Sequence, residues 1–184
     1  MKAYLTMHTL AAAGLALCLS LVATLAAERT TEMERGQLTV KDYKFLADAA
    51  RGGRLEVQLG ELAQQKGVNQ AVRSFGQRMA TDHLKVNDEL SRIAARKGAT
   101  MPVALSHGEN STMEHLQNLA GGEFDRAYAS AMVKDHKTDL REFERAAKDL
   151  NDPDLRELAQ KTLATLQQHL GMAQEMENAV KGEK

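Results

Sequence analysis

The sequence predicts an all-α fold, a four-helix bundle in which one long crossover joins two helical hairpins. Three observations support this prediction: apolar residues recur at helical spacing in four long segments, caps and glycine stops bound those segments, and two of the three connections are short. The composition agrees, since the 184 residues are 43% hydrophobic and 27% charged and include two Pro and no Trp. These values suit one compact helical domain, predicted over residues 39–181.

Residues 1–27 have the layout of a secretory signal peptide. Lys2 precedes a long apolar stretch, and small residues, Ala26 and Ala27, occupy its end. We expect cleavage near Ala26 or Ala27, a flexible segment over residues 28–38, and a periplasmic or secreted protein. An inner-membrane anchor formed by the uncleaved segment is the alternative, because the apolar run approaches the length of a membrane span.

The single cysteine, Cys18, lies in the predicted signal peptide, so the mature chain would have no disulfide, thiolate ligand or cysteine nucleophile. No stable membrane insertion is expected after cleavage. The formal net charge is −1, with Lys and Arg dispersed among acidic residues, and the only aromatic residues are three Tyr and four Phe. Nucleic acid is therefore not expected as a partner, because phosphate binding needs clustered cations and single strands usually need stacking rings.

The first predicted helix begins near Thr39, where Thr39 and Asp42 have capping-box spacing, and ends at Gly67. Its predicted inner face is Ala49, Gly53, Glu56, Gly60 and Ala63. The second helix is predicted over residues 68–97, and Gly98 stops it. Its predicted inner face, at steps of three and four, is Val72, Phe75, Met79, His83, Val86, Leu90 and Ile93.

The third predicted helix starts after Gly121 and Gly122. Its predicted inner face is Phe124, Tyr128, Met132, His136, Leu140, Phe143 and Ala147. The fourth opens with Asp152 as its N-cap and Pro153 at its first helical position. Its predicted inner face is Leu155, Ala159, Thr162, Leu166, His169, Ala173, Met176 and Val180.

The lengths of the connections set the topology. Short links near Gly67 and Asn151 make the first two helices antiparallel neighbours, and likewise the last two. Residues 98–122 form a long connection that contains a short capped helix, predicted over residues 111–119. At about 3.3 Å per residue this connection can cross the whole bundle, so the two middle helices can run parallel.

One pattern occurs twice: an aromatic residue, three residues, Met, two residues, and Asp-His. The first copy is Phe75, Met79, Asp82 and His83, and the second is Tyr128, Met132, Asp135 and His136. In each copy the aromatic residue, Met and His recur at helical spacing, which places an imidazole in the stripe that should be buried. A protein core rarely holds such a group without a partner. The repeated pattern therefore points to a site.

The two repeated histidines, His83 and His136, lie near the midpoints of their predicted helices. Glu56 and His169 lie within about one helical turn of the midpoints of the first and fourth helices. All four side chains can therefore share one layer in the middle of the bundle, whichever way the helices run.

Two glycines, Gly53 and Gly60, lie on the same predicted face as Glu56. Glycine costs a helix interior about 1 kcal/mol relative to Ala, so two of them need a reason. They indicate either close packing of helix backbones or space kept beside Glu56 for another group. Both interpretations stay open at the level of the sequence.

Four stretches carry a family resemblance: LADAARGGRLEVQLGELA, FGQRMATDHLKVNDEL, FDRAYASAMVKDHKTDLREFE and TLATLQQHL. They resemble a bacterial exported family known only as domain of unknown function 4142 and thought to be ferritin-like. The similarity spans about residues 41–170 and implies a ferritin-like four-helix bundle and export, but no activity. FDRAYASAMVKDH also resembles a second exported helical family, with Met and His motifs, that has been linked to copper.

The sequence departs from the ferritin-like di-iron pattern, in which two helices each carry a Glu and the other two carry Glu-x-x-His. No Glu-x-x-His occurs here, and Asp82-His83 and Asp135-His136 stand in its place, with Asp139 three residues after His136. Adjacent helical residues point about 100° apart, so the Asp and His of one pair cannot both face the same ion. This departure puts iron oxidation of the ferritin kind in doubt.

We expect the mid-bundle layer to bind a transition-metal ion, either copper, zinc or iron. The predicted ligands are Glu56, His83, His136 and His169. The residues predicted to support them, as soft ligands or as acceptors behind the imidazoles, are Met79, Met132, Asp82, Asp135 and Asp139.

A hypothesis of another class is a non-enzymatic, stress-related structural or interaction protein. In that case the His and Glu layer is a buried hydrogen-bond network that fixes the register of the bundle, or a proton sensor near pH 6. The sequence has no phosphate-binding loop, nucleophile elbow or zinc-protease helix, so an enzyme is not expected. Any catalysis would be redox or peroxide chemistry at a bound metal.

Overall fold

The computed structural model describes residues 38–182, which form five α-helices and no strand. The helices are α2 (Val40–Lys66), α3 (Gln70–Arg96), α4 (His107–Gln117), α5 (Gly121–Asp149) and α6 (Pro153–Lys181). This confirms the all-α prediction. The predicted signal peptide, residues 1–27, and the predicted flexible segment except its last residue lie outside the described residues.

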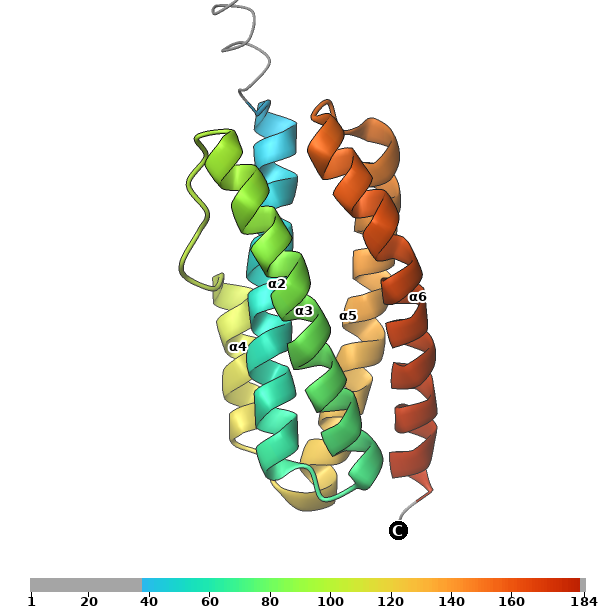
Figure 1. Cartoon of the computed structure of the whole chain (residues 1–184). Helices are drawn as coiled ribbons and strands as arrows, with labels where there is room; N and C mark the ends of the chain where they lie inside the picture. Colours follow the sequence, from blue (N-terminus) through green and yellow to red (C-terminus); the bar gives the residue numbers. More distant parts are fainter. Residues whose placement is uncertain (1–37, 183–184) are drawn as a thin grey trace, which may run out of the picture. The chain divides into compact units, whose positions relative to one another are not determined.

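The four long helices are arranged as two antiparallel hairpins, α2–α3 and α5–α6 (Figure 1). The segment from the end of α3 to the start of α5 returns along the bundle, so α3 and α5 run in the same direction, as the length of this connection predicted. The short helix α4 lies on this return path and packs against α2 and α5. Within residues 38–182 none of the helices has the length and hydropathy of a membrane span.

The helix starts follow local capping chemistry. Thr39 and Asp42 form a capping box at α2, and the Asp152 side chain accepts a hydrogen bond from the Leu155 amide at the start of α6. Both caps were predicted. The short helix was placed incorrectly, because α4 begins at His107, where Ser106 and Glu109 form a capping box that the sequence analysis overlooked.

Most of the predicted inner faces are buried. Only four of their members are half-buried instead, and these are Ala49, Val86, Leu140 and Ala147. On α6 the predicted inner face is buried throughout. The steps of three and four along the sequence therefore identify the sides of the helices that form the core.

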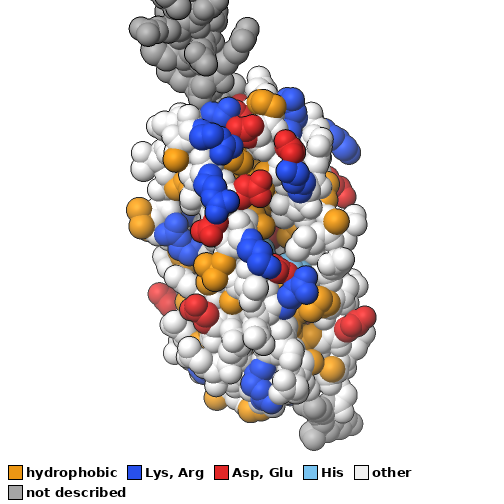
Figure 2. Space-filling model, in the orientation of Figure 1, with side chains coloured by type: hydrophobic (Ala, Val, Ile, Leu, Met, Phe, Trp, Pro, Cys, Tyr) orange, Lys and Arg blue, Asp and Glu red, His pale blue; other side chains and the backbone are white. Residues whose placement is uncertain are grey.

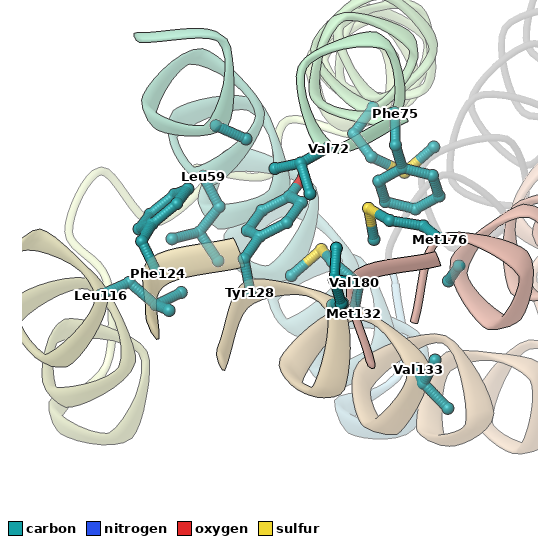
Figure 3. Packing of buried hydrophobic residues seen from close by; sticks show 14 of the residues in the cluster. Leu59, Val72, Phe75, Leu116, Phe124, Tyr128, Met132, Val133, Met176 and Val180 are labelled. Carbon is teal, nitrogen blue, oxygen red and sulfur yellow. The ribbon is translucent and has the colours of Figure 1, made fainter. Parts of the chain in front are cut away.

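The core consists of two apolar clusters, one towards each end of the bundle. The first surrounds Phe75, Tyr128 and Met176 and is the cluster seen in Figure 3. The second surrounds Leu90 and Phe143. On α3, α5 and α6 the histidine predicted for the middle layer lies between the residues of these two clusters, and on α2 Glu56 follows Leu55, the first residue of the first cluster. The site is thus a polar layer enclosed between two apolar ones.

The glycines of α2 serve helix packing. A Cβ atom on Gly60 would lie 2.5 Å from the carbonyl oxygen of Gly76 on α3, and one on Gly76 would lie 2.6 Å from the carbonyl oxygen of Gly60. At Gly53 the corresponding space is filled by the Asn87 side chain. The contact at Gly60 supports the close-packing interpretation, whereas Gly53 leaves room for another group, the side chain of Asn87.

Each hairpin connection is held by an aspartate from the other hairpin. Asp42 of α2 accepts hydrogen bonds from the amides of Asn151 (2.8 Å) and Asp152 (3.2 Å), at the α5–α6 connection. Asp125 of α5 accepts from the amides of Val68 (3.2 Å) and Asn69 (2.7 Å), at the α2–α3 connection. These contacts fix the lengthwise register of the two hairpins, and hence the height at which their polar residues meet.

The surface carries charges of both signs. On the face seen in Figure 2, Lys and Arg side chains are interspersed with Asp and Glu, and the hydrophobic side chains are scattered. This matches the even distribution of charge along the sequence. The expectation that nucleic acid is not a partner stays a prediction.

Candidate metal centre

Three imidazoles from three helices meet in the polar layer: His83 of α3, His136 of α5 and His169 of α6. Their exposed fractions are 7%, 0% and 1%. The ring centroids are 6.0 Å apart for His83 and His136, 5.6 Å for His83 and His169, and 5.4 Å for His136 and His169. One ring nitrogen of each histidine lies within 4.8 Å of the other two. Three potential ligand atoms therefore share one small volume.

Two of these rings are held from outside by hydrogen bonds. The Nδ1 of His136 donates to the Met132 carbonyl oxygen at 2.9 Å, one helical turn earlier. The Nε2 of His169 donates to Asp82 Oδ2 of α3 at 3.1 Å. A carbonyl or carboxylate oxygen can only accept, so these nitrogens carry the protons, and in a neutral ring the other nitrogen keeps its lone pair.

On each ring one buried nitrogen has no hydrogen-bond partner. These atoms are Nε2 of His83, Nε2 of His136 and Nδ1 of His169, and all three are buried. A buried polar group without a partner costs about 1–3 kcal/mol. In His136 and His169 one ring nitrogen donates to Met132 or Asp82, and the unpartnered nitrogen is the other one, which carries the lone pair.

The surroundings keep all three imidazoles neutral at physiological pH. Burial, reinforced by the neighbouring imidazoles, lowers the pKa of His83 to about 3. Burial lowers the pKa of His169 to about 4, although its hydrogen bond to Asp82 acts in the opposite direction. Burial also lowers the pKa of His136. Neutral imidazole is the form that binds a metal ion.

Asp82 is the charged group behind the cluster. Burial works against its charge, but hydrogen bonds from Arg78, His169 and Lys85 outweigh burial and lower the pKa of Asp82 to about 2. The carboxylate is therefore ionised and accepts from His169. Arg78 and Lys85 were overlooked in the sequence, although they lie four residues before and three after Asp82, where helical side chains meet.

Glu56 lies beside the imidazoles but belongs to a second group. Its carboxylate is fully buried and lies with those of Asp135 and Asp139, one oxygen of each within 4.8 Å of the others. Its Oε1 is 3.9 Å from His136 Nδ1, which is the nitrogen that donates to Met132 and not the unpartnered one. The single layer of four predicted ligands is therefore divided into three imidazoles and an adjacent group of three carboxyls.

Ionising the three neighbouring carboxyls together is unfavourable. The pKa of Glu56 is raised well above its ordinary value, first by burial, then by a hydrogen bond with the Asp135 carboxyl and by the charges of Asp135 and Asp139. Burial also raises the pKa of Asp139, and the charges of Asp135 and Glu142 add to this effect. Asp135 and Asp139 therefore lie beside Glu56. The acceptors behind the imidazole rings are Asp82 and the Met132 carbonyl.

The two methionines predicted as soft ligands belong to the apolar core. Met79 and Met132 are buried in the apolar cluster around Phe75, and what Met132 gives to His136 is its backbone carbonyl. The two histidines of α4, His107 and His115, are exposed. The residues of the imidazole cluster therefore come from α3, α5 and α6, and those of the carboxyl cluster come from α2 and α5.

Fold and site together define an all-helical bundle protein with a buried layer of imidazole and carboxyl groups. The chain belongs to the family described as domain of unknown function DUF4142, which matches residues 27–176. This confirms the resemblance drawn from the four sequence stretches.

The fold is also similar to that of a solved structure, "Crystal structure of DUF305 fragment from Deinococcus radiodurans". The TM-score is 0.67 at 14% sequence identity, and the match covers 79% of this chain and 98% of that chain. At this identity the likeness concerns the fold alone. No protein with a curated description matches the sequence.

Proposed function

We propose that this protein binds a transition-metal ion through His83, His136 and His169. The observation that carries the proposal is the set of three buried ring nitrogens, one on each imidazole, that have no hydrogen-bond partner. A metal ion between the rings would give each of these nitrogens a partner and so offset the cost of burying it.

The chemistry of the three rings favours zinc or copper. Neutral imidazole is a preferred ligand of both ions, whereas Ca²⁺ and Mg²⁺ prefer oxygen. Around a tetrahedral zinc, nitrogens at about 2.0–2.1 Å from the ion are about 3.3 Å from one another. One ring nitrogen of each histidine lies within 4.8 Å of the other two, so small rotations of the rings would bring three ligand nitrogens to this spacing.

The hydrogen bonds behind the rings support the same function. In metal sites the second ring nitrogen usually donates to a carboxylate or a backbone carbonyl, which fixes the orientation of the ring. Asp82 takes this position for His169, and the Met132 carbonyl takes it for His136. If the layer were instead a closed hydrogen-bond network that fixes the register of the bundle, the three unpartnered ring nitrogens would have hydrogen-bond partners.

We further infer that the bundle is ferritin-like and that the protein is exported. Two antiparallel hairpins with a crossover that makes α3 and α5 parallel support the ferritin-like arrangement. The layout of residues 1–27 supports export. Iron oxidation of the ferritin kind is not part of the proposal, because Glu-x-x-His is absent from the sequence and the three imidazoles take its place.

Zinc binding to the purified protein tests the proposal. We expect one ion per chain in the imidazole site, measured by competition with a chromogenic chelator after removal of any affinity tag. The double variant H83A/H169A should bind zinc more than about a hundred-fold more weakly. His115→Ala is the matched control, because His115 is exposed on α4, and it should bind like the unmodified protein.

Circular dichroism of each variant verifies that the helices are retained. Equal zinc affinity in H83A/H169A and in the unmodified protein would refute the assignment. Folded protein that binds no zinc or copper at any concentration tested would favour the structural alternative.

A further inference from the structure

The cluster of three carboxyls, from Glu56, Asp135 and Asp139, contributes no ligand to the imidazole site. Glu56 comes from α2, and the two aspartates lie one turn apart on α5. One oxygen of each carboxyl lies within 4.8 Å of the others. The three acids therefore face one another across the contact between the two hairpins.

Glu56 distinguishes this group from an ordinary acidic cluster. Its side chain is fully buried, and its carboxylate oxygens receive no hydrogen bond from any N–H or hydroxyl in residues 38–182; the group beside them is the carboxyl of Asp135, which is itself an acid. No Lys or Arg forms an ion pair with Glu56 among the described residues, and Nδ1 of His136 lies 3.9 Å from Glu56 Oε1. A buried carboxyl in this position requires a proton or a cation.

Two hollows lead towards the group. Asp135 lines a pocket of about 390 Å³ between α2, α4 and α5. Asp139 lines a smaller hollow of about 30 Å³, together with Asp48 and Glu142. Glu56 lines neither hollow, so an ion would pass Asp135 or Asp139 before it reaches Glu56, and in the smaller hollow it would also pass Asp48 and Glu142.

We propose that Glu56, Asp135 and Asp139 form a second cation site, for a divalent ion that prefers oxygen ligands. Carboxylates suit Mn²⁺, Ca²⁺ and Mg²⁺, whereas the three imidazoles suit zinc and copper. Oxygens on opposite sides of such an ion are separated by roughly 4–5 Å, which agrees with the limit of 4.8 Å. This inference goes beyond the proposed function and depends on different residues.

The electrostatics of the group agree with a missing positive charge. Burial and the neighbouring carboxyls raise the pKa values of Glu56 and Asp139, which reflects the cost of ionising them together. A divalent cation would relieve this repulsion directly. His136 lies between the two sites, with Nδ1 towards Glu56, so an ion in one site lies close to the other.

Mn²⁺ is a suitable probe, because electron paramagnetic resonance measures free aqueous Mn²⁺ directly. We expect the purified protein, with zinc already added, to bind about one Mn²⁺ per chain. Glu56→Gln keeps the size of the side chain and removes its charge, so it should weaken Mn²⁺ binding at least tenfold and change zinc affinity by a much smaller factor, because Glu56 lies beside His136 but supplies no ligand to the imidazole site. Asp139→Asn should act in the same direction.

Glu61→Gln is the matched control, because Glu61 lies on the same helix and is exposed. It should bind Mn²⁺ like the unmodified protein, and H83A/H169A should keep Mn²⁺ while losing zinc. Absence of Mn²⁺ binding at millimolar concentration, or equal binding in E56Q and E61Q, would overturn the second site. Failure of zinc binding alone would refute only the imidazole site, so the two results are distinguishable.

Discussion

His136 is held on one side of its ring and left without a partner on the other. The Met132 carbonyl fixes Nδ1, and Nε2 is buried among the other two imidazoles. Such an arrangement lowers the stability of the folded state unless a partner binds Nε2, since an unpartnered buried polar group costs about 1–3 kcal/mol. The proposed metal site would give this buried nitrogen of His136 a partner.

Asp82 allows a test of how the imidazoles are oriented. Asp82→Asn keeps the shape of the side chain but replaces the carboxylate that accepts from His169. We expect zinc affinity to fall about 10–100-fold, as is typical when the group behind a ligating His is changed. Chelator competition measures this, with Asp88→Asn, exposed on the same helix, as the control. Unchanged affinity in D82N would mean that Asp82 serves only surface ion pairs.

At the scale of single residues, the sequence could predict which residues lie at the same height in the bundle, but not in which direction each side chain points. The repeated pattern around His83 and His136, and the midpoint position of His169, correctly located three imidazoles at one height. Glu56 lies at the same height but faces Asp135 and Asp139. Counting residues along a helix sets the height of a side chain, whereas its direction depends on how neighbouring helices rotate and pack.

The helical hairpins depend on side chains that reach from one hairpin to the other. Asp42 accepts from Thr39 in its own helix and from the amides of Asn151 and Asp152 in the other hairpin. Burial opposes the charge of Asp42, but hydrogen bonds from Thr39, Asp152 and Asn151 outweigh burial and lower its pKa below the ordinary value of 3.8. The ionised form of Asp42 is therefore stabilised by folding.

Asp42→Ala should lower the free energy of unfolding at pH 7 by about 1–3 kcal/mol, because two buried amides lose their acceptor. A lowered carboxyl pKa means that this contribution is complete above pH 3.8 and is lost as pH falls through the lower value in the folded state. Urea unfolding from pH 7 to pH 3 measures it, and the difference between the two proteins should shrink below about pH 4. A constant difference over this range would contradict the pKa assignment.

The contact between α2 and α3 gives a paired test of glycine. Gly60→Ala should destabilise the protein even though Ala is the better helix former, because its Cβ would lie 2.5 Å from the Gly76 carbonyl oxygen. Gly52→Ala, on the same helix, meets nothing within 4 Å and should stabilise by up to about 1 kcal/mol. Thermal unfolding of both variants measures the difference. A stable G60A protein would mean that the helices are not closely packed there.

The starts of α2 and α6 could be predicted from local signals, but the boundary of the short helix was wrong. Thr39 and Asp152 are the N-caps expected there, whereas α5 begins at Gly121 and not after Gly122, and α4 begins four residues before the predicted Ser111. The signal was present, since Ser106 and Glu109 have capping-box spacing. Several Ser, Thr and Asn residues compete as caps in this segment, and only the packing of Met113 and Leu116 on the bundle decides among them.

The whole bundle is divided by its polar layer into two apolar clusters. An ion bound to His83, His136 and His169 would join α3 of one hairpin to α5 and α6 of the other. Binding to the folded state alone adds stability by mass action, about 2.7 kcal/mol when free ion is a hundred times the dissociation constant. The metal site would thus act on the contact between the hairpins.

We therefore expect zinc to raise the unfolding temperature of the protein by roughly 5–10 °C under those conditions. Differential scanning calorimetry with and without zinc measures this shift. H83A/H169A should show no comparable shift, and H115A should behave like the unmodified protein. An equal shift in all three proteins would indicate zinc binding elsewhere on the surface.

The central claim is that three imidazoles from α3, α5 and α6 hold one ion. The most direct measurement is the anomalous diffraction of zinc-loaded crystals, collected on both sides of the zinc absorption edge. The expected result is one peak about 2.0–2.1 Å from a ring nitrogen of each of His83, His136 and His169. Zinc found only at exposed side chains, with the three inner nitrogens still unpartnered, would contradict the account.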